Sequence, residues 1–255
     1  MPTSSLSTVP YITAQDGVPA QLLDVYRPEG APSPSPAVLL WHGSGPDTRF
    51  EVATLARETA GFGVTVFVPD WRPDALDGGR AHLLASLRYV HENAASFGAD
   101  PGHLVVAGWS MGAGAAIGTA LRPDLTGGVL PKVVVGIAGL YGRPARSTGS
   151  VPLEDLARDA APSQNRASAP AAGVPVVLVH GTADAVIESG HSRAFHAALV
   201  ERGGAVSLHE SATDHAGVVM SAYDPALGTC VPATEPGALR AGRDTARLIA
   251  RAALA

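Results

Sequence analysis

The chain has 255 residues, of which 46% are hydrophobic, and a net charge of −5. A chain of this length and composition can bury one large core without disulfides or a structural metal, and its size suits a single α/β domain. The negative charge and the lack of a long Lys/Arg run argue against a nucleic-acid partner, and no apolar run approaches the ~18 residues of a membrane span.

Short apolar runs alternate with amphipathic stretches along the chain, which is typical of a parallel sheet covered by helices on both faces. The runs that we expect to form strands are 21–26, 37–41, 64–68, 104–107, 132–138, 174–179 and 205–210. Helical spacing of apolar residues and the small-residue run after the fourth of these strands predict helices over 81–93, 113–121, 192–201 and 239–254. The pattern predicts one α/β domain over residues 1–255.

Two segments interrupt this alternation. Residues 143–173 are rich in Pro, Ser and Ala, with one short helix expected near 153–159. Loops of that length are usually lids, binding loops or disordered stretches, so we expect a small lid segment or none. The second segment, 216–237, precedes the last helix, and its sequence indicates no role.

The sequence VVAGWSMGAGAA, residues 105–116, places a serine between glycines directly after an expected strand. A strand, a sharp turn and a helix are the setting of a nucleophile elbow. Gly108 and Gly112 stand where a Cβ atom would collide as the chain reverses. Ser110 would then lie exposed at a helix N-terminus, where the amide ends favour developing negative charge.

This glycine-rich segment also fits other interpretations. Small residues at this spacing also form seams for helix packing. The glycines also match a nucleotide-binding turn, but that turn follows the first strand of its fold, and no Y-x-x-x-K supports it: Tyr141 precedes Ala145, and Tyr223 precedes Leu227, by four residues. The turn HGSGPD lacks the lysine of a phosphate-binding loop, and no H-E-x-x-H or paired C-x-x-C supports a metal.

A serine hydroxyl needs a neighbouring base that is held by an acid. His215, in SATDHAG, follows the last expected strand, and Asp184, in HGTADAVI, follows the strand before it. The chain order Ser, Asp, His is the order of α/β-hydrolases and differs from that of chymotrypsin or subtilisin. Glu188 and Asp214 compete with Asp184 for the role of the acid.

Backbone amides must also stabilise the negative oxygen of a tetrahedral intermediate. The sequence LLWHGSGPD leaves a strand in a His-Gly turn, and we expect the Ser44 amide to be one donor and the Met111 amide the second. His42 is expected to brace this loop rather than to act as acid or base. Cys230, the single cysteine, is expected to be a buried or loop thiol.

The four motifs HGSG, GWSMGAG, HGTAD and DHAG together resemble the α/β-hydrolase superfamily over nearly the whole chain. The resemblance implies an eight-stranded, mostly parallel sheet with helices on both sides and a small cap or none. The run DVYRP before HGSG resembles carboxylesterases and lipases, and GWSMG is also similar to dienelactone-hydrolase-like and polyester-hydrolase proteins. Esterases of the first kind have H-G-G-G where Ser44 stands, and dienelactone hydrolases have cysteine in place of Ser110.

The predicted function is hydrolysis of small carboxylic esters, with short acyl groups, through an acyl-enzyme on Ser110 and without a cofactor. Hydrolysis of polyesters, thioesters or lactones, acyl transfer or a lyase reaction with the same triad, and a non-catalytic receptor on the same fold remain alternatives. A monomer and a homodimer both stay open. The single cysteine favours a cytoplasmic location, with export open if a leader has been trimmed. The residues expected to line the substrate cleft are Trp109, Tyr141, Phe50 and Trp71.

Overall fold

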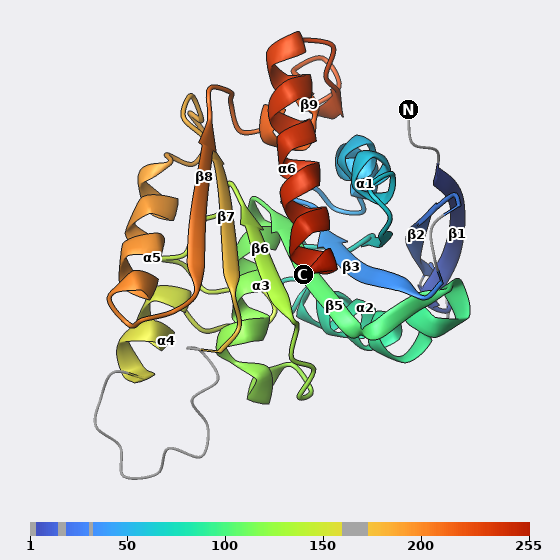
Figure 1. The fold of residues 1–255 in the computed structure, drawn as a ribbon, viewed down its shortest axis with the longest axis horizontal. Helices are drawn as coiled ribbons and strands as arrows, with labels where there is room; N and C mark the ends of the chain where they lie inside the picture. The colour runs from blue at the N-terminus through green and yellow to red at the C-terminus, as the bar shows by residue number, and fades with distance from the viewer. Residues whose placement is uncertain (1–3, 15–18, 31–32, 160–172) are drawn as a thin grey trace.

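A computed structural model describes residues 4–14, 19–30, 33–159 and 173–255. These residues form a central eight-stranded sheet in the order β1-β2-β4-β3-β5-β6-β7-β8 (Figure 1). Its strands are β1 (Ser4–Ile12), β2 (Gln21–Pro28), β3 (Ser35–Trp41), β4 (Thr65–Pro69), β5 (Ala99–Trp109), β6 (Val133–Ile137), β7 (Val176–Gly181) and β8 (Val206–Ser211). The pairs β1/β2 and β2/β4 are antiparallel and the others are parallel, which confirms the predicted fold class.

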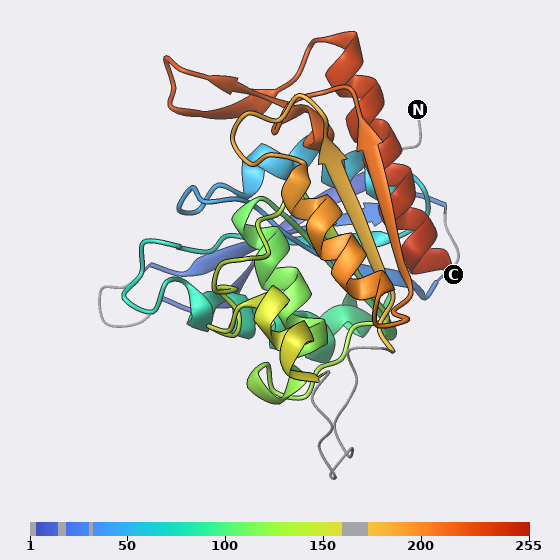
Figure 2. The ribbon, with the colours of Figure 1, turned by 90° about the vertical axis from the view of Figure 1, so that its left-hand side faces the viewer.

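Helices cover both faces of the sheet, as Figures 1 and 2 show. They are α1 (Ala53–Ala60), α2 (Arg80–Asn93), α3 (Met111–Leu121), α4 (Pro152–Asp159), α5 (Gly190–Val200) and α6 (Pro236–Leu254). Leu87 of α2 and Phe195 of α5 belong to the apolar core on one face. Leu55 of α1 and Ile249 of α6 belong to the core on the other face. The two layers explain why the central strands are apolar throughout.

Strand β5 illustrates how the sequence builds this arrangement. Successive side chains of a strand point to opposite faces of the sheet. Val106 accordingly joins the core under α2 and α3, whereas Val105 joins the core under α1 and α6. Both are fully buried. Burying a side chain of this size contributes about 1.5–3 kcal/mol, so a polar residue at either position would be costly.

Three elements were not expected from the sequence. Strand β1 pairs with β2 at the edge of the sheet, and α1 is a two-turn helix between β3 and β4. The segment 216–237 holds a two-stranded hairpin of β9 (Ser221–Asp224) and β10 (Thr229–Pro232). Glu51 fastens this hairpin, because its Oε1 accepts hydrogen bonds from the Thr229 hydroxyl at 2.7 Å and the Cys230 amide at 2.9 Å.

The expected lid segment, 143–173, is described only in part. Its predicted short helix is present as α4, while residues 160–172 lie outside the described residues. Within the described ranges, no helix combines the length and the apolar character that a bilayer crossing demands.

Candidate active site

Ser110 lies in a sharp turn between β5 and α3, with a backbone conformation of φ 56° and ψ −118°. A positive φ is uncommon for a residue with a side chain and costs on the order of 1–3 kcal/mol. The turn is secured by the Ser110 amide, which donates to the Ile137 carbonyl at the end of β6 at 2.8 Å. Such strain at the end of a central strand is what a nucleophile elbow requires.

Gly108 and Gly112 allow this turn because nothing larger fits. A Cβ atom on Gly108 would collide with the carbonyl of Gly112. A Cβ atom on Gly112 would lie 2.5 Å from the His42 carbonyl oxygen and 2.7 Å from that of Trp41. Because these obstacles are backbone atoms, the close approach of α3 to β3 depends on the absence of a side chain at both glycines.

Asp184 and His215 meet at the ends of β7 and β8. The Asp184 Oδ2 atom lies 2.7 Å from the His215 Nδ1 atom. Asp184 is buried, and the His215 side chain is 12% exposed, so the pair is shielded while the imidazole still reaches the surface. A carboxylate on Nδ1 holds that proton in place and leaves Nε2 free to accept another.

His180 is a second partner of this carboxylate that the sequence reasoning missed. Its Nε2 atom lies 2.8 Å from the Ile187 carbonyl and 3.2 Å from Asp184 Oδ2, and its Nδ1 atom lies 2.7 Å from the Ser192 hydroxyl. Both neighbours of Nε2 are acceptors, which places the imidazole proton on that atom. The fully buried His180 therefore donates toward Asp184 and helps to fix the carboxylate.

Trp109 connects the two halves of the site. Its indole N–H donates to the His215 carbonyl at 2.9 Å, and the two rings lie 5.2 Å apart between centroids. His215 therefore lies against the residue next to Ser110. Within the described residues, the side chains of Ser110 and His215 share no hydrogen bond. Such contacts often tighten only when substrate binds.

The loop after β3 lies against the elbow. A Cβ atom on Gly43 would be 3.5 Å from the Ser110 Cβ atom. Neither the Ser44 amide nor the Met111 amide has an acceptor in the described part of the chain, as expected for Met111 at the first position of a helix. Both residues line one cleft together with Ser110.

His42 braces this loop from below. Its Nε2 atom accepts a hydrogen bond from the Trp71 amide at 3.2 Å, and its Nδ1 atom lies 3.1 Å from the Thr48 hydroxyl. The imidazole is fully buried, and this burial lowers the pKa of His42 to about 3. A neutral, fully engaged ring of this kind is a structural support rather than a proton carrier.

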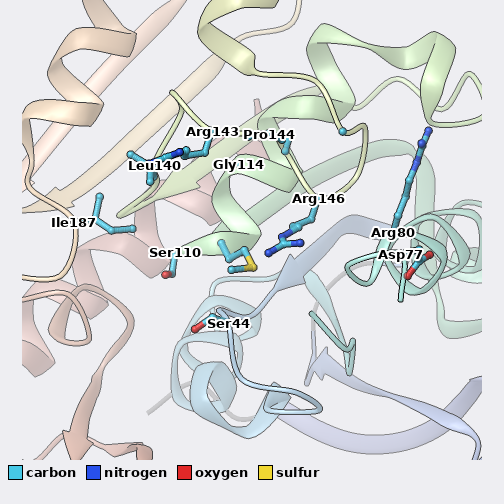
Figure 3. Close-up of a pocket in the computed structure, with 13 residues that line it drawn as sticks. Ser44, Asp77, Arg80, Ser110, Gly114, Leu140, Arg143, Pro144, Arg146 and Ile187 are labelled. Carbon is cyan, nitrogen blue, oxygen red and sulfur yellow. The ribbon is translucent and has the colours of Figure 1, made fainter. Parts of the chain in front are cut away.

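The cleft over Ser110 has a volume of about 660 Å³. Figure 3 shows Ser44 and Ser110 near one another on its floor, with Ile187 on one side and Arg146, Asp77 and Arg80 on the other. This volume lies within the usual range for small-molecule sites.

No family model matches the chain, and no curated protein matches its sequence. Solved structures do match. A bacterial heroin esterase is 22% identical with a TM-score of 0.69, and the match covers 98% of this chain and 84% of that one. A truncated carbohydrate esterase from gut microbiota is 15% identical with a TM-score of 0.66, covering 99% and 98%. The thermophilic esterase Est2 from the planctomycete Thermogutta terrifontis is 20% identical with a TM-score of 0.67, covering 95% and 89%.

The chain has the α/β-hydrolase fold. In an open α/β sheet, functional groups gather at the carboxyl ends of the parallel strands. Ser110 after β5, Asp184 after β7 and His215 after β8 all come from that edge of the sheet.

The four aromatic residues expected to line the cleft do not do so. The prediction is wrong for Trp71 and Tyr141, because both side chains are fully buried. The Tyr141 ring stacks on Phe195, with 4.5 Å between the ring centroids. Trp109 is also buried, because its ring packs against His215. Phe50 is half exposed but lies in the 3₁₀ helix η1 (Arg49–Val52), outside the lining residues.

The rival acids and the cysteine are placed differently from Asp184. Glu188 is exposed, and Asp214 uses its Oδ1 to accept the Gly217 amide at 2.7 Å. Burial, with the nearby Glu51 charge, raises the pKa of Cys230 to about 11. A buried thiol that stays protonated at neutral pH is unsuited to act as a nucleophile.

Proposed function

We propose that this protein is a serine hydrolase that cleaves carboxylic esters, with Ser110 as nucleophile, His215 as base and Asp184 as its orienting acid. The observation that carries the proposal is the 2.7 Å contact between Asp184 and His215 Nδ1, with His215 packed on the neighbour of a strained elbow serine. The three structural neighbours described above are all esterases, which supports the same reaction class.

The proposed reaction has two halves. The Ser110 oxygen attacks the ester carbonyl carbon while its proton passes to His215 Nε2. The resulting imidazolium is stabilised by Asp184 and gives the proton to the leaving alcohol as the carbon–oxygen bond breaks. A water molecule then attacks the acyl-enzyme in the same way, which releases the carboxylic acid and restores the Ser110 hydroxyl.

The tetrahedral intermediate in each half carries a negative oxygen. The amides of Ser44 and Met111 are the proposed donors to it, because both lack an acceptor in the described residues and both border the cleft beside Ser110. Removal of one such donor typically costs 10²- to 10³-fold in kcat. Short acyl groups remain the proposed substrates, and the single cysteine keeps the cytoplasm as the proposed location.

Hydrolysis of 4-nitrophenyl butyrate and labelling by a fluorophosphonate test the proposal directly. We expect turnover and labelling in the native protein, and a loss on the order of 10⁶ in kcat with no labelling for Ser110→Ala. Ser96→Ala, an exposed serine in the 3₁₀ helix η2 (Ala94–Phe97), is the matched control and should keep the native rate.

Two outcomes would contradict the hydrolase assignment. The first is a folded native protein that neither turns over the ester nor reacts with the fluorophosphonate, which would favour a receptor on this fold. The second is an equal loss of activity in both serine variants, because that would detach the effect from the elbow.

A further inference from the structure

The cleft over Ser110 has an unbalanced charge. Three arginines, Arg80, Arg143 and Arg146, border it, against one carboxylate, Asp77. The protein as a whole carries a net charge of −5, so this positive excess runs against its overall charge. A concave site lined by one sign of charge concentrates the field and attracts ligands of the opposite sign.

Arg80 and Asp77 already have partners. The Arg80 guanidinium donates to the Leu125 carbonyl at 3.3 Å. Asp77 accepts the amide of Gly79 at 2.9 Å on one oxygen and the amide of Ala81 at 2.7 Å on the other. Partial burial acts to raise the Asp77 pKa, but these backbone hydrogen bonds outweigh it and hold the pKa below its usual value.

Arg146 is different: the residue is partly buried, and its guanidinium has neither an ion-pair partner nor a hydrogen-bond acceptor in the described part of the chain. The guanidinium lies close to Gly78, where a Cβ atom would be 2.5 Å from the Arg146 Nη1 atom. Figure 3 shows this side chain directed into the cleft, toward the floor where Ser44 and Ser110 lie. A guanidinium that has lost part of its hydration is well suited to accept a carboxylate, often through two parallel hydrogen bonds.

Arg143 borders the same cleft from the same loop but is exposed. Within the described residues it also lacks a carboxylate partner. Because an exposed charge is well screened by water and salt, Arg143 would contribute mainly to the attraction of an anion.

The reaction geometry decides which part of an ester faces Arg146. The leaving oxygen must face His215, which protonates it. His215 is bound to Asp184, whose Oδ1 accepts the Ile187 amide at 2.9 Å, and Ile187 borders the cleft on the side opposite Arg146 (Figure 3). A leaving alcohol on the His215 side of Ser110 then extends toward Ile187, and the opposite side of the cleft, toward Arg146, is left for the acyl part.

We propose that the acyl part of the natural substrate carries a carboxylate that pairs with Arg146, which makes the substrate a monoester of a dicarboxylic acid. This inference rests on the proposed esterase function, because the acyl direction follows from the roles of Ser110 and His215.

Two esters that differ only in charge test the inference: 4-nitrophenyl monoadipate, and its neutral analogue in which a carboxamide replaces the carboxylate. The native protein should have a higher kcat/KM for the anionic ester, by about 10- to 100-fold, which is the usual effect of a charge-assisted hydrogen bond. The preference should appear mainly in KM. It should shrink at 0.5 M salt, because an ionic strength of roughly 0.5 M screens a partly exposed pair of charges.

Arg146→Gln should lower the ratio of the two kcat/KM values by about 10-fold or more, and Arg146→Lys should retain part of the preference because the charge remains. The matched control is Arg251→Gln, which removes the same charge from an exposed residue on α6, away from the cleft. This control should keep the native ratio. Rates in Ser110→Ala serve as the blank for spontaneous hydrolysis.

The outcomes separate this inference from the proposed function. Turnover of both esters at similar efficiency, or an equal loss for both in Arg146→Gln, overturns the inference and leaves the esterase function standing. A folded protein that hydrolyses neither ester and resists the fluorophosphonate overturns both. A charge preference that Arg146→Gln removes and Arg251→Gln does not supports the inference.

Discussion

The Asp184 carboxylate is held by four contacts that together dictate what an amide would do in its place. Oδ1 accepts hydrogen bonds from the Val186 amide at 2.8 Å and the Ile187 amide at 2.9 Å. Oδ2 faces His215 Nδ1 at 2.7 Å and His180 Nε2 at 3.2 Å. A carboxylate can accept from all four neighbours at once.

In Asp184→Asn, the side-chain oxygen should remain on the Val186 and Ile187 amides, because both are donors. The new NH₂ group then faces His215, and a donor at that place forces His215 Nδ1 to become an acceptor. The imidazole proton moves to Nε2, which can no longer receive the Ser110 proton. The ring keeps its position but has the wrong tautomer.

We expect kcat for 4-nitrophenyl butyrate to fall about 10⁴-fold in this variant, which corresponds to about 5.5 kcal/mol of transition-state stabilisation. KM should change little, because the amide is nearly the same size as the carboxylate. The fold should survive, since only the weaker His180 contact and one charge-assisted hydrogen bond are lost, and circular dichroism would verify this.

Glu188→Gln is the matched control, because Glu188 is an exposed carboxylate four residues away and should leave kcat unchanged. A near-native rate in folded Asp184→Asn would refute the reasoning and transfer the acid role to another carboxylate. An equal loss in the two variants would mean that net charge, rather than the tautomer, controls the rate.

Two further predictions concern the supports of the site. Gly112→Ala should lower the free energy of unfolding by about 3 kcal/mol and reduce kcat, because the added methyl group would collide with the carbonyls of Trp41 and His42. Urea titration would measure the stability and the butyrate assay would measure kcat. An unchanged stability would contradict the close contact of Gly112 with these carbonyls. Because burial lowers the pKa of His42 to about 3, the unfolded chain binds one more proton than the folded chain between that pH and about pH 6.5. Stability should therefore fall by about 1.4 kcal/mol for each pH unit below about 6.5, and the loss from pH 6.5 to pH 5 should be about 2 kcal/mol smaller in His42→Asn. An identical pH dependence in both proteins would show that His42 is not responsible.

The sequence predicted the sheet well because parallel strands buried on both faces must be apolar throughout. All seven expected strands form. Six of them agree with their expected ends within two residues, while β5 runs from Ala99 to Trp109 where 104–107 was expected. Strand β1 was missed because it lies at the edge, where one side is solvated and the sequence SSLSTVPYI carries polar residues. The β9–β10 hairpin was missed because it is held by Glu51, more than 160 residues away in the chain.

The predictions for the site also differ in what they needed to know about side-chain packing. Ser110 was chosen from the glycine-flanked turn between a strand and a helix, and Asp184 and His215 from their places after the last two parallel strands; neither rule needs knowledge of side-chain packing. The prediction that four aromatic residues line the cleft was wrong because composition does not tell which side chains turn inward. Tyr141 is buried against Phe195, while Arg146, five residues later in the same loop, borders the cleft. The proposed catalytic residues could thus be located by motif and topology. The proposed substrate contact depends on the conformation of a loop, which is why the charge at the cleft became visible only in the structure.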